Sequence, residues 1–393
     1  MPASNVQVCR YCVMDANHPG VEFDASGQCN CCSASLRRLP LEWWPGEVGA
    51  RKMQDLMAQL REEGRGKPYD AMIGLSGGID SAYLAHILTS EHKLRVLAVH
   101  VDGGWNSVAA VSNIESLVRK TGIDLHTVVI EWDEMRDLQL AFLRAGVFNQ
   151  DFPQDHAFFT TLIRTANRYK IRSFLSGVNF SSENVEVPAG PSVTAYDGRH
   201  LRAIHDRFGT RPLRTFPVAS LRSYIWSTRV RGRPVVHKPL NFVDYDKEKA
   251  KETLREVYGW RDYGPKHSES RFTKFYQEIY LPRKYLMDKR RLHLSSLIVA
   301  GQATRDQALE QVELPALDPE QAMRDIRFVA KKLGIAVDEL NDLIDAPPVL
   351  HTAYPNDMAL QRNLLGLQEK FRRVRARWLP AANMESPKKA VVA

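Results

Sequence analysis

The sequence predicts an α/β protein with a doubly wound, mostly parallel sheet, a small cysteine-rich module before the sheet and a helical region after it. Three observations support this prediction. Apolar, strand-like runs alternate with helix-like patterns through the first half of the chain. A glycine-rich turn directly follows the first of these runs. All five cysteines lie between Cys9 and Cys32, well before the alternating region.

The composition is that of a globular protein. The chain has 393 residues, and at about 150 residues per domain this length suggests two to three domains. With 44% hydrophobic and 25% charged residues, a fibrous or wholly disordered chain is excluded. No apolar run reaches the ~18 residues of a membrane-spanning helix, and the N-terminus lacks a signal-peptide pattern. We therefore expect a cytoplasmic protein with no transmembrane segment.

The four-cysteine pattern of the N-terminus predicts a metal site. Cys9 and Cys12 form one C-x-x-C pair, and Cys29 and Cys32 form a second after sixteen intervening residues. Two such pairs close a tetrahedral zinc site with no open coordination position, as in a zinc ribbon. An iron–sulfur cluster and free thiols are the alternatives. Cys31 competes with Cys32 as fourth ligand, but only Cys32 gives the two-residue spacing. We assign the module to residues 1–40 and expect it to serve stability or docking.

The glycine-rich turn predicts a phosphate site. A short apolar strand at residues 70–74 enters the sequence Ser-Gly-Gly-Ile-Asp-Ser of residues 76–81, and a helical pattern follows. A strand, a glycine turn and a helix N-terminus together point backbone N–H groups at one spot, which suits a phosphate. The turn contains no lysine, so it is not a Walker A loop.

This turn resembles the SGGxDS loop (PP-loop) of the N-type ATP pyrophosphatases, whose nucleotide domain is of the HUP type. The resemblance implies that ATP is cleaved between its α- and β-phosphates and that an oxygen of the substrate is adenylated. It assigns the nucleotide domain to residues 41–245. It also implies that Asp80 helps to place Mg²⁺. The phosphate cradle that it implies consists of Leu75, Ser76, Gly77, Gly78, Asp80 and Ser81.

The elements after the loop fit the doubly wound sheet. Strand signals occur at 94–101, 125–132 and 171–176, separated by helical patterns at 108–120, 133–145 and 156–169. Ligands of such sheets bind beyond the carboxyl ends of the strands, where this chain has two polar loops. By resemblance, the first loop places His100, Val101 and Asp102 beside adenine and ribose. The second brings Gly177 to the nucleotide, and Asn179 and Glu183 toward Mg²⁺ or the reacting groups, unless Glu183 is merely a solvated loop acid.

The cysteine distribution limits the reactions that such a domain could perform. Sulfur transfer to tRNA by a persulfide-type thiolase needs a catalytic cysteine near the nucleotide, and none follows Cys32. A built-in glutaminase also needs a nucleophile, but position 2 is proline and no cysteine lies in a later nucleophile elbow. Ammonia for amide chemistry would therefore come from another protein.

Segments of the second half resemble the N-acetyl sugar amidotransferases of surface-polysaccharide (LPS, O-antigen) biosynthesis. These segments are residues 259–280, 281–298 and 301–309, and with the cysteine pairs and the phosphate loop the resemblance covers roughly residues 8–315. Cys31, where an aromatic residue is expected, and Gly264-Pro265 before Lys266 are departures. Lys266 and Arg271 are candidate catalytic residues and Glu269 and Lys274 are candidate substrate ligands, although each could equally be a surface charge.

The resemblance implies an ATP-dependent, AMP-forming amidotransferase. The acetamido oxygen of a nucleotide-linked N-acetyl sugar would attack the α-phosphate, pyrophosphate would leave, and ammonia would displace AMP to give an acetamidino sugar. The implied cofactors are ATP, Mg²⁺ and Zn²⁺. The implied partner is a glutaminase–cyclase pair that supplies ammonia, and a homo-oligomer is compatible with the sequence. The alternatives are a tRNA-modifying enzyme that adenylates a base carbonyl and a non-catalytic adaptor, against which the intact loop counts.

The net charge of +8 comes from one stretch of the chain. Between Arg199 and Lys238 lie nine Arg and one Lys against one acid, Asp206, which gives a local charge of +9. This predicts an anionic partner or a solvated loop. Given the resemblance, we expect the diphosphate of a sugar nucleotide or an acidic protein surface rather than nucleic acid.

The remaining residues predict a helical C-terminal region at 246–380. Thr304 and Gln307 form a capping box, a helix runs from Asp318-Pro319 to Gly334, and a short one from Val337 stops at Pro347-Pro348. An apolar stripe predicts a last helix, packed in the core, on a partner or, less favoured, on a membrane. It consists of Leu364, Leu367, Phe371, Val374 and Trp378. We expect the tail at 381–393 to be disordered.

Overall fold

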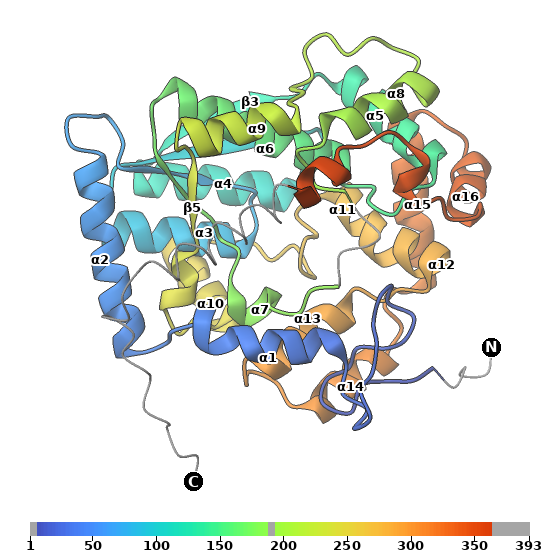
Figure 1. The fold of residues 1–393 in the computed structure, drawn as a ribbon, viewed down its shortest axis with the longest axis horizontal. Coiled ribbons are helices and arrows are strands. Elements are labelled where there is room, and N and C mark those ends of the chain that lie inside the picture. Colours follow the sequence, from blue (N-terminus) through green and yellow to red (C-terminus); the bar gives the residue numbers. More distant parts are fainter. Residues whose placement is uncertain (1–5, 188–192, 364–393) are drawn as a thin grey trace.

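The computed structural model describes residues 6–187 and 193–363. Its centre is a five-stranded parallel sheet with the strand order β3-β2-β1-β4-β5 (Figure 1). Strands β1 and β2 pair from Ala71 opposite Val96 to Gly74 opposite Val99. The strands are β1 (Ala71–Gly74), β2 (Val96–Asp102), β3 (Asp124–Val129), β4 (Ser173–Leu175) and β5 (Val235–His237).

Helices cover both faces of the sheet because the side chains of a strand alternate between its faces. Ala71 and Ile73 of β1 pack with α2, α3, α4 and α10, whereas Met72 packs with α6. The α-helices before β4 are α1 (Asn30–Glu42), α2 (Glu47–Glu63), α3 (Ile79–His86), α4 (Val108–Thr121), α5 (Trp132–Ala145) and α6 (Phe152–Arg168). Between β4 and β5 lie α7 (Phe180–Glu183), α8 (Gly198–Phe208) and α9 (Leu221–Ile225).

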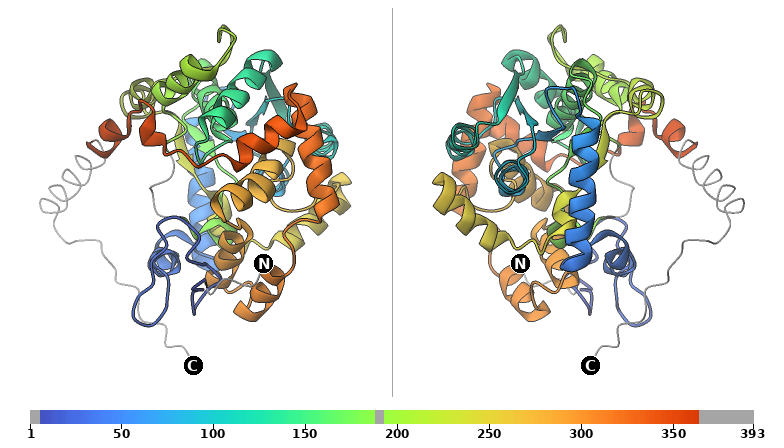
Figure 2. Two further views of the ribbon diagram at one scale, coloured as in Figure 1. Left: turned by 90° about the vertical axis from the view of Figure 1, so that its right-hand side faces the viewer. Right: turned by 90° about the vertical axis from the view of Figure 1, so that its left-hand side faces the viewer.

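The chain after β5 is helical and packs on the N-terminal module. A shared core joins Cys9, Cys12 and Cys32 to α11–α13, α15 and α16. In both views of Figure 2 the dark blue N-terminal segment accordingly lies next to the orange helices. These helices are α10 (Lys247–Tyr258), α11 (Arg271–Phe275), α12 (Leu281–Tyr285), α13 (Arg290–Val299), α14 (Arg305–Glu313), α15 (Pro319–Leu333) and α16 (Val337–Asp345).

The predicted fold class is confirmed, and most elements lie where the sequence places them. The Thr304 capping box forms, and α15 ends at Gly334 in a left-handed conformation. Two details differ. Trp132 opens α5 instead of ending a strand, because Glu131 caps the helix with its own carboxylate. The edge strand β5, three residues long, was not among the predicted strands.

Three predictions about the ends and the domain boundaries of the chain are not tested by the structure. The stripe from Leu364 to Trp378 and the tail at 381–393 lie outside the described residues. The domain boundaries after residues 40 and 245 stay predictions, and α10, just after the second boundary, packs against α3 and α4. Among the described helices, none is long and apolar enough to cross a membrane.

Candidate functional site

The glycine-rich loop, here called the phosphate loop, lies between β1 and α3, and its backbone lies close to α4. Gly77 has a φ of +83°, and a Cβ added there would lie 2.8 Å from the Cβ of Ala110. The hydroxyl of Ser76 accepts the N–H of Gly78 at 3.1 Å and lies 3.3 Å from that of Ser81. The loop leads directly into the N-terminus of α3, where the helix dipole favours a negative charge.

The loop lies at the point where the strand order reverses. The chain proceeds from β1 to β2 and β3 on one side and then returns to β4 on the other, so a crevice forms beyond β1 and β4. A Cβ on Gly177, after β4, would lie 3.0 Å from the backbone nitrogen of Ser81. A cavity of about 760 Å³ opens here. The predicted residues that line it are Leu75, Ser76, Gly78, Asp80, Ser81, His100, Val101, Gly177, Glu183, Lys266 and Glu269.

Two carboxylates and one ammonium group meet in this cavity. The Nζ of Lys266 lies 2.8 Å from Oε1 of Glu183 and 3.6 Å from Oδ2 of Asp80. Burial alone would lower the pKa of Lys266, but the charges of Asp80 and Glu183 outweigh it and raise the pKa above its ordinary value. The lysine therefore stays charged and partly neutralises the two carboxylates that it faces.

Asp80 is held by Asn179, which was predicted from the sequence, and by Tyr245, which was not. The Tyr245 hydroxyl donates to Oδ1 of Asp80, and Nδ2 of Asn179 lies 3.4 Å from the same oxygen. A second tyrosine, Tyr263, accepts the N–H of Ile79 at 3.0 Å. No local pattern marks either tyrosine, because each reaches the loop from far along the chain.

The end of β2 and the loop that follows it are fixed by hydrogen bonds. Nδ1 of His100 donates to the carbonyl oxygen of Leu75 at 2.7 Å, and Nε2 accepts from Asn106 at 3.1 Å. The Asp102 carboxylate accepts the N–H of Gly104 at 2.8 Å and the amide of Asn106 at 3.1 Å. His100 and Val101 thus line the cavity, whereas Asp102 bonds within its loop.

Glu269 is packed against the phosphate loop. A Cβ on Gly78 would lie 2.7 Å from Oε1 of Glu269, and Oε2 is buried without a hydrogen-bond partner among the described residues. Burial raises the pKa of Glu269 to about 7. Its backbone oxygen accepts the N–H of Ser107 at 2.8 Å, which joins this segment to the loop after β2.

The structure places Arg271 and Lys274 away from the cavity. Both bind the buried Asp325 of α15, with nitrogen–oxygen distances of 3.2 and 2.7 Å. The guanidinium of Arg271 also lies 4.2 Å from the centre of the Phe328 ring. Neither side chain lines the cavity wall.

The cavity has a polar end and an apolar wall. The polar end comes from the start of α6 and from the segment around α11, and burial raises the pKa of its Asp155 to about 7. It consists of Asp151, Gln154, Asp155, Ser270, Thr273 and Gln277. The apolar wall includes Phe158, Phe159 and the stacked rings of Tyr196 and Tyr224, whose centres are 3.7 Å apart.

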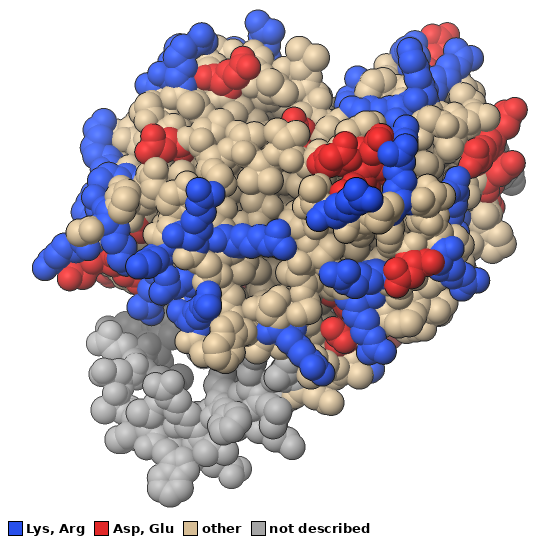
Figure 3. Space-filling view, turned by 90° about the horizontal axis from the view of Figure 1, so that it is seen from above, with Lys and Arg blue, Asp and Glu red and all other residues tan. Residues whose placement is uncertain are grey.

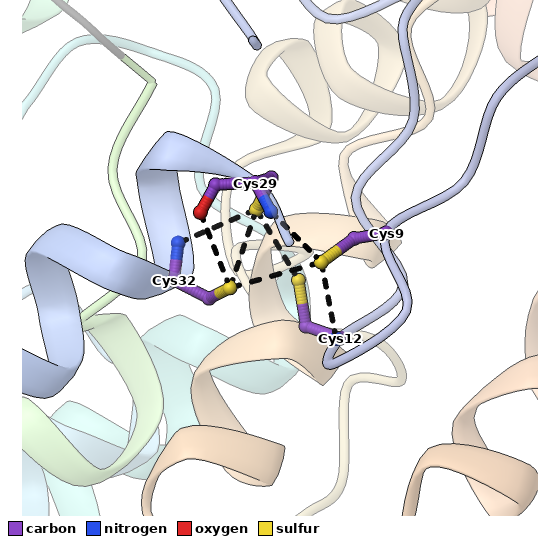
Figure 4. A group of neighbouring side chains, drawn as sticks. All are labelled: Cys9, Cys12, Cys29 and Cys32. Carbon is purple, nitrogen blue, oxygen red and sulfur yellow. Dashed lines mark hydrogen bonds between the residues drawn. The ribbon is translucent and has the colours of Figure 1, made fainter. Parts of the chain in front are cut away.

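Four N-terminal cysteines form a closed cluster (Figure 4). Their sulfur atoms all lie within 4.8 Å of one another and are buried. Three Sγ–Sγ distances are 3.7, 3.6 and 3.4 Å, for Cys9–Cys32, Cys12–Cys29 and Cys29–Cys32. Four thiolates at ~2.3 Å from one tetrahedral ion would be roughly 3.8 Å apart, so the cluster fits a single metal ion. The Cys31 thiol lies outside it and bonds Oδ1 of Asn30 at 3.4 Å.

The basic stretch at 199–238 does not surround the cavity. Lys238 lines it, but none of the nine arginines does. Arg199 and Arg211 pair with Asp357 and Asp133 at 3.6 and 2.8 Å. On the face over α8 and α9, Lys and Arg accordingly lie in separate groups with uncharged surface between them (Figure 3).

Residues 269–367 match the family model described as LPS biosynthesis protein WbpG-like, C-terminal domain. This matched segment, 99 of the chain's 393 residues, is referred to as the WbpG-like domain. The predicted resemblance to enzymes of surface-polysaccharide biosynthesis is confirmed for this part of the chain. The WbpG-like domain begins at Glu269 and contributes Ser270, Thr273 and Gln277 to the cavity of the phosphate loop. A comparison with curated proteins found no match.

Several solved structures share a loose likeness with the chain. An NMN synthetase from Francisella tularensis is 17% identical with a TM-score of 0.34, covering 70% of this chain and 99% of its own. An NH₃-dependent NAD synthetase from Campylobacter jejuni is 13% identical with a TM-score of 0.31, covering 77% and 99%. The U34-tRNA thiolase NcsA from Methanococcus maripaludis is 16% identical with a TM-score of 0.30, covering 80% and 91%. Our assignment of the fold depends on the sheet order and loop geometry instead.

Proposed function

We propose that the protein is an ATP-dependent, AMP-forming amidotransferase that converts the acetamido group of a nucleotide-linked N-acetyl sugar into an acetamidino group for LPS biosynthesis. One observation carries the proposal: the WbpG-like domain and the phosphate loop line the same cavity. A domain similar to those of LPS biosynthesis proteins and a loop suited to a nucleoside triphosphate thus line the same cavity, where their two substrates could react.

The phosphate loop would bind the β- and γ-phosphates of ATP. Ser76, Gly77, Gly78 and Ser81 offer backbone and hydroxyl groups at the positive end of α3. The cavity volume of about 760 Å³ lies in the range of small-molecule sites. The wall around Phe158 is suited to adenine, and the polar end is suited to the hydroxyl and acetamido groups of a sugar.

The reaction would proceed in two balanced steps. The acetamido oxygen forms a bond to the α-phosphorus, and the bond from that phosphorus to the bridging oxygen breaks, releasing pyrophosphate. Lys266 would stabilise the charge that moves onto this oxygen. Ammonia then attacks the imidate carbon, its extra proton is lost, and the carbon–oxygen bond breaks to release AMP. Ammonia would come from a separate glutaminase partner.

Two metal sites belong to the proposal. Asp80 and Glu183 provide the carboxylate oxygens that Mg²⁺ prefers, and both already face one cation, Lys266. When bound there, Mg²⁺ would neutralise phosphate charge. The four cysteines would hold Zn²⁺, because their sulfur spacing suits one tetrahedral ion better than a multi-iron cluster, in which each iron takes its own thiolate.

The test supplies purified protein with ATP, Mg²⁺ and ammonium, and adds either a panel of nucleotide-linked N-acetyl sugars or bulk tRNA. We expect AMP and pyrophosphate to appear with one of the sugars. Release with tRNA alone would overturn the proposal in favour of a tRNA-modifying enzyme. An Asp80→Ala protein should be inactive with either substrate, and its activity would contradict the assignment of Asp80.

A further inference from the structure

Asn184 follows α7 directly and joins three helices through one buried side chain. It is 1% exposed. Its Nδ2 donates to the carbonyl oxygens of Phe180 at 2.7 Å and Ser296 at 2.8 Å, and its Oδ1 accepts from the Ser35 hydroxyl. Phe180 belongs to α7, Ser296 to α13 and Ser35 to α1. Removing the amide would cost each of these three groups one buried hydrogen bond, although the Ser296 oxygen would keep the bond that it accepts from the N–H of Ala300 at 3.0 Å.

The helix that carries Glu183 cannot hold its own position. Helix α7 spans four residues, Phe180–Glu183, and a helix this short is unstable without tertiary contacts. Beyond Asn184, the N–H of Val185 donates to the hydroxyl of Ser296 at 3.0 Å. Glu183 also pairs with Lys266, and the N–H of Phe180 donates to Oδ1 of Asn241 at 2.7 Å. The end of α7 that carries Glu183 is held in addition by α1 and α13, through Asn184 and Val185.

Both supporting helices are anchored at the four-cysteine cluster. The sulfur of Cys29 caps α1 by accepting the N–H of Cys32, and Ser35 lies on the same helix. On α13, the hydroxyl of Ser295 accepts the N–H of Val13 at 3.3 Å, and Arg291 donates to the oxygen of Val13 at 2.7 Å.

The backbone of the cluster is also clamped from α14. Arg305 donates from Nη2 to the carbonyl oxygen of Cys9 at 3.0 Å and from Nε to that of Cys12 at 3.2 Å. Since α13 and α14 pack on each other, the first cysteine pair and α13 form one unit.

We infer that Asn184 is a positioning residue through which the four-cysteine centre sets the place of Glu183. The centre orders α1 and α13, these helices fix Asn184, and Asn184 fixes the end of α7. The coupling between the cysteine centre and α7 is inferred from the hydrogen bonds described above alone. Only the consequence for Mg²⁺ and turnover rests on the proposed function.

Amide hydrogen exchange tests the coupling without any substrate. Peptides covering 179–187 are compared in wild type and Asn184→Ala, each with its metal and after removal of the metal by a chelator. In wild type, we expect metal removal to accelerate exchange in 179–187 by about tenfold or more. Asn184→Ala with its metal bound should show the same acceleration, and removing its metal should add little, because the connection is already broken.

The control is Asn167→Ala on α6. Asn167 also donates to two oxygens, those of Ile163 and Ser227, both at 2.9 Å, but it does not touch α7. It should leave exchange in 179–187 unchanged. If metal removal unfolds the whole chain, the coupling is tested by comparing exchange in 179–187 between metal-bound Asn184→Ala and metal-bound wild type. If the Asn184→Ala protein is itself unfolded, the same comparison is made with metal-bound Ser35→Ala, which removes one hydrogen bond to Asn184. If the variant used for this comparison exchanges its 179–187 amides at the wild-type rate, the inference is overturned.

Turnover gives a second, separate readout. Asn184→Ala should raise the Mg²⁺ concentration for half-maximal sugar-dependent pyrophosphate exchange several-fold, with the metal content of the cysteine cluster unchanged. An unchanged Mg²⁺ requirement would contradict the part of the inference that concerns Glu183. A wild-type protein without sugar-dependent exchange would instead refute the proposed function, and hydrogen exchange would still decide the coupling.

Discussion

Lys266 and Glu183 form the closest ion pair of the cavity, with 2.8 Å between Nζ and Oε1. Glu183 is the last residue of α7, which follows β4, and Lys266 precedes the WbpG-like domain by three residues. The pair therefore joins the edge of the sheet that carries the phosphate loop to the segment that directly precedes the WbpG-like domain. It also concentrates both signs of charge at the phosphate loop.

Lys266→Met should lower the rate of sugar-dependent AMP formation by about a hundredfold or more, because it removes a preorganised cation from the reaction centre. Steady-state kinetics with saturating ATP and Mg²⁺ measures the effect. Lys274→Met is the matched control. It removes a lysine that binds Asp325 outside the cavity, so it should lower thermal stability and leave the rate within severalfold of wild type. Equal rate losses in both variants would contradict the role of Lys266.

Gly77→Ala should abolish ATP binding and reduce the free energy of unfolding by about 2–4 kcal/mol. The variant combines a strained positive φ with a contact 2.8 Å from Ala110. Gly66→Ala separates the two effects, because Gly66 also has a positive φ, +71°, but nothing lies within 4 Å of the added carbon. It should cost about 1–2 kcal/mol. Chemical denaturation and nucleotide titration measure both variants, and normal nucleotide binding by Gly77→Ala would refute the loop assignment.

Glu269→Gln should change how stability depends on pH. A glutamate in an unfolded chain has a pKa of about 4.3, whereas burial raises that of Glu269 to about 7. Between these values the folded state binds more protons than the unfolded state, so stability falls as the pH rises. The variant has no carboxyl group at this position and does not lose this stability. The difference between its free energy of unfolding and that of wild type should therefore increase by about 1–3 kcal/mol from about pH 4 to about pH 8.

Glu256→Gln, an exposed substitution on α10, is the control for this pH experiment. Urea denaturation at a series of pH values gives the three curves. If the curve of Glu269→Gln runs parallel to that of wild type, the carboxyl group of Glu269 is not shielded from water as the structure indicates.

Much of the fold follows from local sequence patterns, and the site follows only in part. The phosphate loop could be placed from the sequence because the strand, the glycines and the helix are consecutive. By contrast, Tyr245 reaches Asp80 across 165 residues, a contact that no local pattern encodes. The sequence also shows Arg271 and Lys274 as charges near a predicted site. It does not show that Asp325 of α15 binds both.

The two adjacent cysteines give a matched pair of metal-site variants. Cys32→Ser should reduce bound metal well below one ion per chain and lower the melting temperature, because it removes one of four clustered ligands. Cys31→Ser changes a buried thiol outside the cluster and should retain the metal. Elemental analysis of both purified proteins measures the metal, which we expect to be zinc. Loss of metal from Cys31→Ser, or iron in the wild type, would contradict the assignment.

The fate of the acetamido oxygen tests the proposed reaction most directly. A nucleotide-linked N-acetyl sugar labelled with oxygen-18 in its acetamido carbonyl is incubated with the protein, ATP, Mg²⁺ and ammonium, and the products are analysed by mass spectrometry. The proposed adenylation predicts that the label appears in the phosphate of AMP and that the sugar gains nitrogen from ammonium. AMP without the label, or a sugar that keeps it, would contradict the account.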